Sequence, residues 1–393
     1  MAGALVTTNV VSTLCAMGLA TLRDRLALVL VANREYERMI TGATRFSTVN
    51  VAVPAAVASR VVAPNVIPPA VTAVTPTSVP ITLSQWYESP FAMDDKGVAQ
   101  VDNGIVPMQA KEAIKSLANT IEDYLWTLLT TGTAAVAAIG NSAGTAGTTP
   151  FGTGLDDFLA ADKVLNDNLA DSEDRYMIIN TAAKASAMGL RAIQDASFRA
   201  NSGPNSLISG EIGNVLGARW LMSQRVPNHT NGTLGAGTTV TGINAIGATT
   251  IALSGGASGT ILAGDIIRFG ATSAYTYNVV SSVGGGTPSS VVIAYPGLIA
   301  ATAGAEAVSI STASVIAAHN ILIQKNCLAF AMAPLLDTVE VPGATLQAVA
   351  IDEVSGLSLR LEVTRQHRQV QWAFDALYGG AVIRPQIACW LLG

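Results

Sequence analysis

Charged residues are scarce in this sequence. They make up 12% of its 393 residues, about half of the roughly 25% that globular chains carry. So little charge does little to keep copies apart in solution, which suits a protein whose surfaces are covered by neighbouring copies; an enzyme with a large core and a small surface is the ordinary alternative. The formal net charge of -5 argues against a nucleic-acid-binding protein, because such a protein needs a basic face for phosphates.

Cysteines and long apolar runs are also scarce. Cys15, Cys327 and Cys389 are far apart in sequence, which favours buried thiols in a reducing compartment over a disulfide framework. The apolar stretch at residues 10–22 has no preceding positive charge and ends at Arg23. A membrane span needs about 20 apolar residues. We therefore expect neither a signal peptide nor a membrane anchor, and a protein that is made in the cytoplasm.

Three segments have the apolar periodicity of helices. Residues 107–129 form the best of them, because Pro107 suits a first turn and one stripe of the helix is apolar. The members of this stripe are Ile114, Leu117, Ile121, Leu125 and Leu128. The other two are residues 5–40 and 155–169. At this length the chain is expected to form two or three domains, or one domain with insertions.

The segments between these helices have weaker patterns. Residues 130–154 are rich in Ala, Gly and Thr and predict a mobile loop. Residues 175–179 predict a buried strand, and Thr181 is expected to cap a helix that runs to about residue 194. Residues 210–227 predict a glycine-rich turn that leads into a strand.

Residues 44–87 have residue types that are typical of β-strands, but prolines interrupt them. Between residues 53 and 80 there are six prolines and one charge. Proline at this density excludes a helix and a central strand, and leaves extended or edge structure. The strand-like flanks at 44–53 and 81–87 therefore resemble the two arms of a long loop that extends away from any core. Because this loop is so apolar, it needs a surface to lie on.

Residues 231–312 differ from everything around them. They contain three charges and many Gly, Ser and Thr residues. Short strand patterns separated by turn signals recur at 250–253, 265–269, 275–280, 291–295 and 308–311. This arrangement predicts a small β-barrel or sandwich inserted into a loop of the host fold.

The C-terminal stretch combines a strand pattern with a buried tail. Residues 357–363 alternate between leucine or valine and polar residues, which is the period of a half-buried strand. The tail after Gly380 ends on Trp390 and two leucines. Because so apolar an end cannot be solvated favourably, we expect it to be core, in this chain or against another copy.

The motifs do not assemble a catalytic site. Residues 140–144 match the G-x-S-x-G pattern around Ser142, but the residues that follow cannot form the helix that a nucleophile elbow requires. None of His229, His319 and His367 lies in a triad context. A chance match in an Ala/Gly/Ser loop is the better explanation.

Cofactor and metal sites are equally unsupported. No lysine follows a glycine as a phosphate-binding loop requires, and the histidines, cysteines and acidic pairs lack the spacing of metal ligands. We expect no catalytic, cofactor-binding or metal-binding residues. Arg365, His367 and Arg368 form a polar run that is either a ligand-binding cluster or an intersubunit patch, and arginine favours the second.

Several stretches, taken in order, resemble the major capsid proteins of tailed double-stranded-DNA bacteriophages, which have the Hong Kong 97-type shell fold. They lie at 174–180, 210–227, 320–331 and 375–379 with Arg384-Pro385. Residues 263–269 also look like the opening of the inserted β-barrel that one branch of these proteins carries. The resemblance covers nearly the whole chain.

This resemblance implies an α+β fold with an inserted all-β domain. The implied parts are an N-terminal arm (1–41), an extended β-hairpin loop (42–102), a spine helix of the peripheral domain (103–131), an axial domain (132–230), the insert (231–312) and return strands of the axial and peripheral domains (313–393). No motif marks Lys96, the lysine of the extended loop, as a crosslinking residue.

The implied function is self-assembly, without catalysis, into the icosahedral shell around packaged DNA. The implied partners are other copies in hexamers and pentamers, scaffolding and portal proteins, a decoration protein as an open option, and DNA contacted non-specifically, with no membrane. The implied location is the virion capsid, assembled in the host cytoplasm. The residues expected at contacts between subunits are Trp86, Tyr87, Arg360, Arg365, His367 and Arg368. The alternatives are a serine hydrolase using Ser142 and a phage tail or surface-adhesin component.

Overall fold

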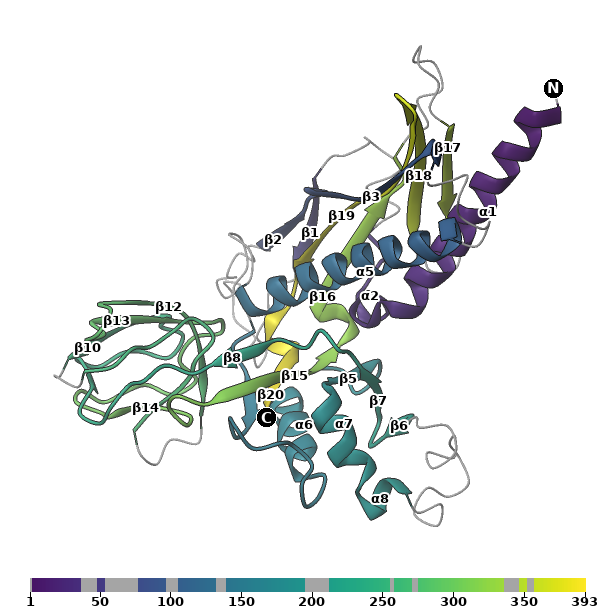
Figure 1. The fold of residues 1–393 in the computed structure, drawn as a ribbon. Coiled ribbons are helices and arrows are strands. Elements are labelled where there is room, and N and C mark those ends of the chain that lie inside the picture. The colour runs from purple at the N-terminus through teal and green to yellow at the C-terminus, as the bar shows by residue number, and fades with distance from the viewer. Residues whose placement is uncertain are drawn as a thin grey trace, which may run out of the picture.

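The computed structural model describes residues 2–36, 48–53, 77–96, 105–131, 139–194, 212–254, 258–270, 275–335, 346–351 and 357–393. Two long helices and a five-stranded sheet form one end of the molecule (Figure 1). The helices are α1 (Ala2–Arg25) and α5 (Ile105–Thr131), with the short α2 (Ala27–Val31) after α1. The strands are β3 (Gln85–Asp94), β16 (Leu328–Ala333), β17 (Leu346–Ile351), β18 (Ser358–Gln366) and β19 (Gln369–Val382).

Helices α1 and α5 pack on each other and on one face of this sheet (Figure 1). Gly18 allows the close approach, because a Cβ atom there would lie 2.8 Å from Ile114 and 3.0 Å from Leu359. Leu359 and Phe374 are buried beneath the two helices, and burial of each side chain stabilises the fold by about 1.5–3 kcal/mol. The apolar face predicted for residues 357–363 is therefore confirmed, and α1 covers it together with the expected helix α5.

A seven-stranded sheet forms the second part. Its strands are β4 (Ser142–Gly144), β5 (Arg175–Ile179), β6 (Asn214–Val215), β7 (Ala218–Met222), β8 (Asn228–Thr230), β15 (Ile316–Gln324) and β20 (Ala388–Leu392). The order is β4-β20-β15-β5-β7-β6, and β8 pairs with β15. Helices α6 (Asp156–Asp167) and α7 (Thr181–Met188) bury their apolar sides with residues of this sheet, and the short α8 (Arg191–Gln194) follows. The tail at Trp390 is fully buried here, as predicted.

The all-β unit occupies the third part of the molecule (Figure 1). Its strands are β9 (Thr239–Val240), β10 (Thr250–Ser254), β11 (Ile266–Phe269), β12 (Tyr277–Val283), β13 (Ser290–Ile293) and β14 (Val308–Ile310). They follow the order β14-β11-β12-β13-β10-β9. A bridge between Thr239 and Ala307 nearly closes the ring. The unit has its own apolar core, and the antiparallel strands β8 and β15 connect it to the rest of the chain.

Buried polar groups hold the base of this all-β unit. Asp265 is fully buried, and its carboxylate lies 2.8 Å from Nε2 of His229 on β8. The same carboxylate accepts hydrogen bonds from the backbone N–H groups of Gly232 and Leu262. His319 on β15 packs beside the His229 ring, with the ring centroids 5.6 Å apart. The one buried acid of the unit is thus used to fix the unit to its two connecting strands.

Several local predictions need correction. Asn180, not Thr181, caps α7, because its side-chain oxygen accepts a hydrogen bond from the N–H of Ala183. That helix ends at Met188, and α8 is a separate turn. Part of the predicted loop 130–154 is ordered by the sheet, since β4 pairs in parallel with β20.

The proline-interrupted segment is only partly described. Strands β1 (Val49–Val53) and β2 (Thr77–Ile81) pair antiparallel, whereas residues 54–76 lie outside the described parts of the chain. Of the second arm expected at 81–87, Ile81 ends β2 and pairs with Val49 of β1. Residues 85–87 belong instead to β3, which pairs with β19 over ten residues.

Candidate assembly surface

The predicted contact residues lie on or beside three strands of the five-stranded sheet. Arg360 and Arg365 lie on β18, His367 and Arg368 form the turn to β19, and Trp86 and Tyr87 lie on β3. Arg368 has a φ of 58°, a left-handed conformation that some tight turns have at their third residue. Its carbonyl accepts a hydrogen bond from the N–H of Asp95, so the end of β3 is held against this turn.

The turn and its neighbours form a charged tip, which we define as Asp95, Arg365, His367 and Arg368. The Arg365 guanidinium lies 2.9 Å from an Asp95 carboxylate oxygen, and the two side chains are 70% and 45% exposed. An ion pair so exposed contributes at most about 1 kcal/mol. His367 and Arg368 are also exposed. The tip is therefore accessible to a neighbouring subunit.

Arg360 points into the subunit instead. Its guanidinium donates two hydrogen bonds to Asp375, one of them with a 2.9 Å distance between Nε and Oδ1. The Trp86 indole N–H donates to the same carboxylate over 3.0 Å. The side chains of Arg360 and Asp375 are 13% and 6% exposed. Arg360 was expected to face a symmetry neighbour, and the structure does not support this, because the guanidinium neutralises a buried carboxylate of its own chain.

Trp86 and Tyr87 are exposed aromatic residues on β3. Their side chains are 63% and 45% exposed, although Tyr87 stacks on Tyr378 with 6.1 Å between ring centroids. Within the described residues, β3 pairs only with β19 and is therefore an edge strand. Exposed aromatic side chains on an edge strand are typical of surfaces that another chain covers.

The six predicted residues do not form one patch. Trp86 lies opposite Leu377, whereas Asp94, beside the tip, lies opposite Gln369. These registers are eight residues apart, which corresponds to roughly 26 Å along a strand. The structure therefore separates the charged tip from an aromatic end at Trp86 and Tyr87.

Two features of this sheet were not predicted from the sequence. One is the buried ion pair of Asp375 with Arg360, which a lone acid in an apolar run could have indicated. Strand β17 is the other edge and exposes Val349 and Ile351, at 36% and 54%.

Ser142 does not lie in a catalytic arrangement. It is buried on β4, and its hydroxyl lies 2.8 Å from the Thr276 hydroxyl. Among the described residues the three histidines do not contact it: His229 contacts Asp265, His319 packs on Trp390 and His367 lies at the tip. In the same residues, no group of three His, Cys, Asp or Glu side chains could hold a metal ion, and no helix is long and apolar enough to cross a membrane.

Replacing Ser142 with alanine is therefore expected to leave shell assembly unchanged. The lost hydrogen bond to Thr276 costs about 1 kcal/mol, too little to unfold a domain. Sedimentation of the variant beside the parent protein tests this. Hydrolysis of an activated ester by the parent, abolished in the variant, would instead support a hydrolase.

Comparison with known proteins assigns the chain. The sequence model of phage capsid proteins matches residues 91–294, slightly more than half of the chain. The protein belongs to the phage capsid protein family. The α+β fold with an inserted all-β domain is confirmed, and the protein is a structural protein, the major capsid protein that forms the icosahedral shell of the virion. The copies associate with one another into the capsomers of that shell.

Solved structures similar to the chain have low sequence identity. "Mycobacterium phage Che8" is 14% identical with a TM-score of 0.49, and the match covers 93% of this chain and 90% of that one. The capsid of cyanophage P-SCSP1u is 12% identical with a TM-score of 0.47, covering 89% and 84%. A virus-like particle from Pyrococcus furiosus is 10% identical with a TM-score of 0.41, covering 96% and 97%. No curated protein matches.

Proposed function

We propose that this capsid protein forms hexamers and pentamers through the part built on the seven-stranded sheet, and that other segments tie neighbouring subunits together. Residues 132–230 would then be the axial domain and 103–131 the spine helix. Residues 1–41 would be the N-terminal arm, 42–102 the extended loop, 231–312 the insert and 313–393 the return strands. The all-β unit and the long helix α5 support this division.

One observation carries the proposed contact between subunits: Trp86 is 63% exposed on the edge strand β3. A large aromatic side chain at an open sheet edge is costly to leave in water, and aromatic residues are enriched where interfaces are most strongly stabilised. In a chain that assembles into a shell, another subunit is the natural cover. The charged tip lies on the same strand pair and forms a second contact.

Replacing Arg365 and Arg368 with glutamate is expected to leave the subunit folded and to impair shell closure. Both side chains are exposed, so their loss costs the fold less than about 1 kcal/mol each, whereas reversed charges repel a complementary neighbour. Circular dichroism checks the fold, and sedimentation with negative-stain microscopy measures the closed particles.

The matched control replaces Arg268 and Lys163, two exposed cations away from the tip, with glutamate, and so changes the net charge equally. Normal particles from the control and defective ones from the tip variant support the assignment. Normal particles from both would remove the tip from the interface.

The proposed partners beyond the subunit itself are scaffolding and portal proteins, a decoration protein as an open option, and packaged DNA contacted non-specifically, with assembly in the host cytoplasm. The net charge of -5 suits a wall along which DNA slides, because strong phosphate binding needs many cations. Sedimentation and microscopy of the expressed protein, alone and with candidate scaffolding protein, test the assembly. Monomers under every condition would refute it, and tight DNA binding at physiological salt would refute the proposed DNA contact.

A further inference from the structure

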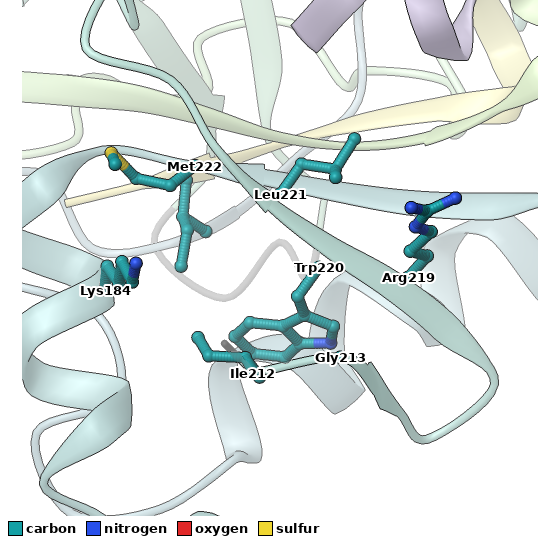
Figure 2. Close-up of a pocket in the computed structure, with 8 residues that line it drawn as sticks. Lys184, Ile212, Gly213, Arg219, Trp220, Leu221 and Met222 are labelled. Atoms are coloured by element: carbon teal, nitrogen blue, oxygen red, sulfur yellow. The ribbon is translucent and has the colours of Figure 1, made fainter. Parts of the chain in front are cut away.

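A pocket of about 280 Å³ lies beside β7, the second strand from the end of the seven-stranded sheet (Figure 2). Its walls come from β5, β7, α7 and the residues before β6. They are Ile179, Lys184, Ile212, Gly213, Arg219, Trp220, Leu221 and Met222. Ile179, Ile212 and Trp220 are nearly fully buried, so the floor of the pocket is apolar and fixed.

Two cations flank this floor. Figure 2 shows Lys184 and Arg219 on either side of Trp220, with Lys184 on α7 and Arg219 on β7. Among the described residues no carboxylate lines the pocket, and neither cation forms an ion pair within that part of the chain. The pocket therefore suits a ligand that carries negative charge.

The pocket is also open along the strand. Strand β6 pairs only with Ala218 and Arg219 of β7. The N–H of Trp220 donates outward to Gly213, whereas that of Ser223 donates inward to Ile179. Because these directions alternate along a strand, the N–H and C=O of Met222 face the open side. A chain approaching from outside meets these free backbone groups beside the pocket.

An acidic turn of the same chain has the complementary charge. Residues 171–174, Asp-Ser-Glu-Asp, are all exposed between α6 and β5. Their backbone is held in place, because Arg175 Nε donates to the Asp171 carbonyl over 2.8 Å and the Lys325 N–H donates to that of Asp174 over 3.1 Å. The carboxylates of Asp171, Glu173 and Asp174 form no ion pair with other described residues. The turn therefore presents three unpaired negative charges in a fixed position.

We propose that the acidic turn 171–174 of one subunit docks into the Lys184/Arg219 pocket of a second copy within a capsomer. This inference rests on the proposed assembly through the seven-stranded sheet, which carries both surfaces. A second copy is favoured because only 12% of this chain is charged, yet these complementary charges form no ion pair among the described residues of their own subunit. A turn that meets a different surface on its neighbour is a head-to-tail contact, which closes into a ring when the rotation fits.

The test reverses the two sides separately and then together. One variant carries Lys184→Glu and Arg219→Glu, and another carries Asp171→Lys and Glu173→Lys. Asp174 is kept because its φ of 52° strains most side chains. Each of these variants is expected to lower the fraction of subunit in closed shells at physiological salt by about tenfold, because like charges then meet across the contact.

The variant with all four changes is expected to recover shell formation to within about twofold of the parent, because the reversed charges are again complementary. Sedimentation measures the particles, and circular dichroism shows whether each subunit is folded. The matched control exchanges an exposed pair on α6, Lys163→Asp with Asp167→Lys, and is expected to assemble normally.

Folded four-change subunits that assemble no better than either two-change variant would overturn the inference, as would two-change variants that assemble normally. In either case the parent protein still forms shells, so the proposed assembly stands. If the parent protein forms no shells under any condition, the proposed assembly itself is wrong. That outcome differs from the two above, because in them the parent protein does form shells.

Discussion

Replacing Asp375 with alanine is expected to lower the free energy of unfolding of the subunit by about 3–5 kcal/mol, because one partner of a buried ion pair is removed. Asp375 is 4% exposed and accepts hydrogen bonds from Arg360 and Trp86. Without the carboxylate, the guanidinium of Arg360, itself 13% exposed, loses both of its hydrogen bonds to Asp375. Denaturant unfolding of the unassembled subunit, followed by circular dichroism, measures the loss.

A matched control uses Arg365, which lies on β18 as Arg360 does. Asp95 pairs with Arg365 of β18 at the exposed tip, so Asp95→Ala removes the same type of interaction in water. Its expected cost is below about 1 kcal/mol. Equal losses in the two variants would contradict the argument that burial makes the Arg360–Asp375 pair essential.

Acidification from pH 6.5 toward pH 4 is expected to destabilise the subunit through His319. Burial lowers the pKa of this imidazole to about 4 in the folded chain, from an ordinary value of 6.5. Within this window the unfolded chain binds the proton and the folded chain does not, so stability falls as pH falls. Above pH 6.5 the ring is neutral in both the folded and the unfolded chain, so this loss of stability is absent. A shift of this size corresponds to about 3 kcal/mol.

The surroundings of His319 explain the direction. Its Nε2 is buried without a hydrogen-bond partner among the described residues, and its ring packs on Trp390 with 5.3 Å between centroids. Burial is the largest cause of the lowered pKa; His229 lowers it further, and Asp265 opposes both. Protonation would place a charge between the apolar tail and the base of the all-β unit.

Comparing His319→Phe with the parent protein isolates this effect. The variant is expected to lose much less stability between pH 6.5 and 4, whereas His367→Phe at the exposed tip serves as the control and keeps the parent's slope. Burial raises the pKa of Glu122, so this group stabilises the fold as pH falls and acts in the opposite direction in all three proteins. A His319→Phe slope equal to that of the parent would exclude His319 as the cause.

Residues close together in the chain were sufficient to predict much of the fold. The apolar stripe of 107–129 lies within α5, and the alternation at 357–363 corresponds to β18. Each of the five strand patterns in 231–312 overlaps one of the strands β10 to β14. In each case the period of the side chains is set by one helix or strand, so no distant contact is needed to recognise it.

Contacts between distant segments decided the rest. Whether Arg360 faces water or a buried acid depends on the pairing of β18 with β19, and the place of Trp86 depends on the pairing of β3 with residues 369–378. The Lys184/Arg219 pocket likewise needs α7, β5 and β7 to meet. Composition and periodicity thus determined the classes of helix, strand and insert and the poverty of charge. Only the tertiary structure decided which charges neutralise one another inside the subunit, because ion pairing depends on distances that sequence spacing does not contain.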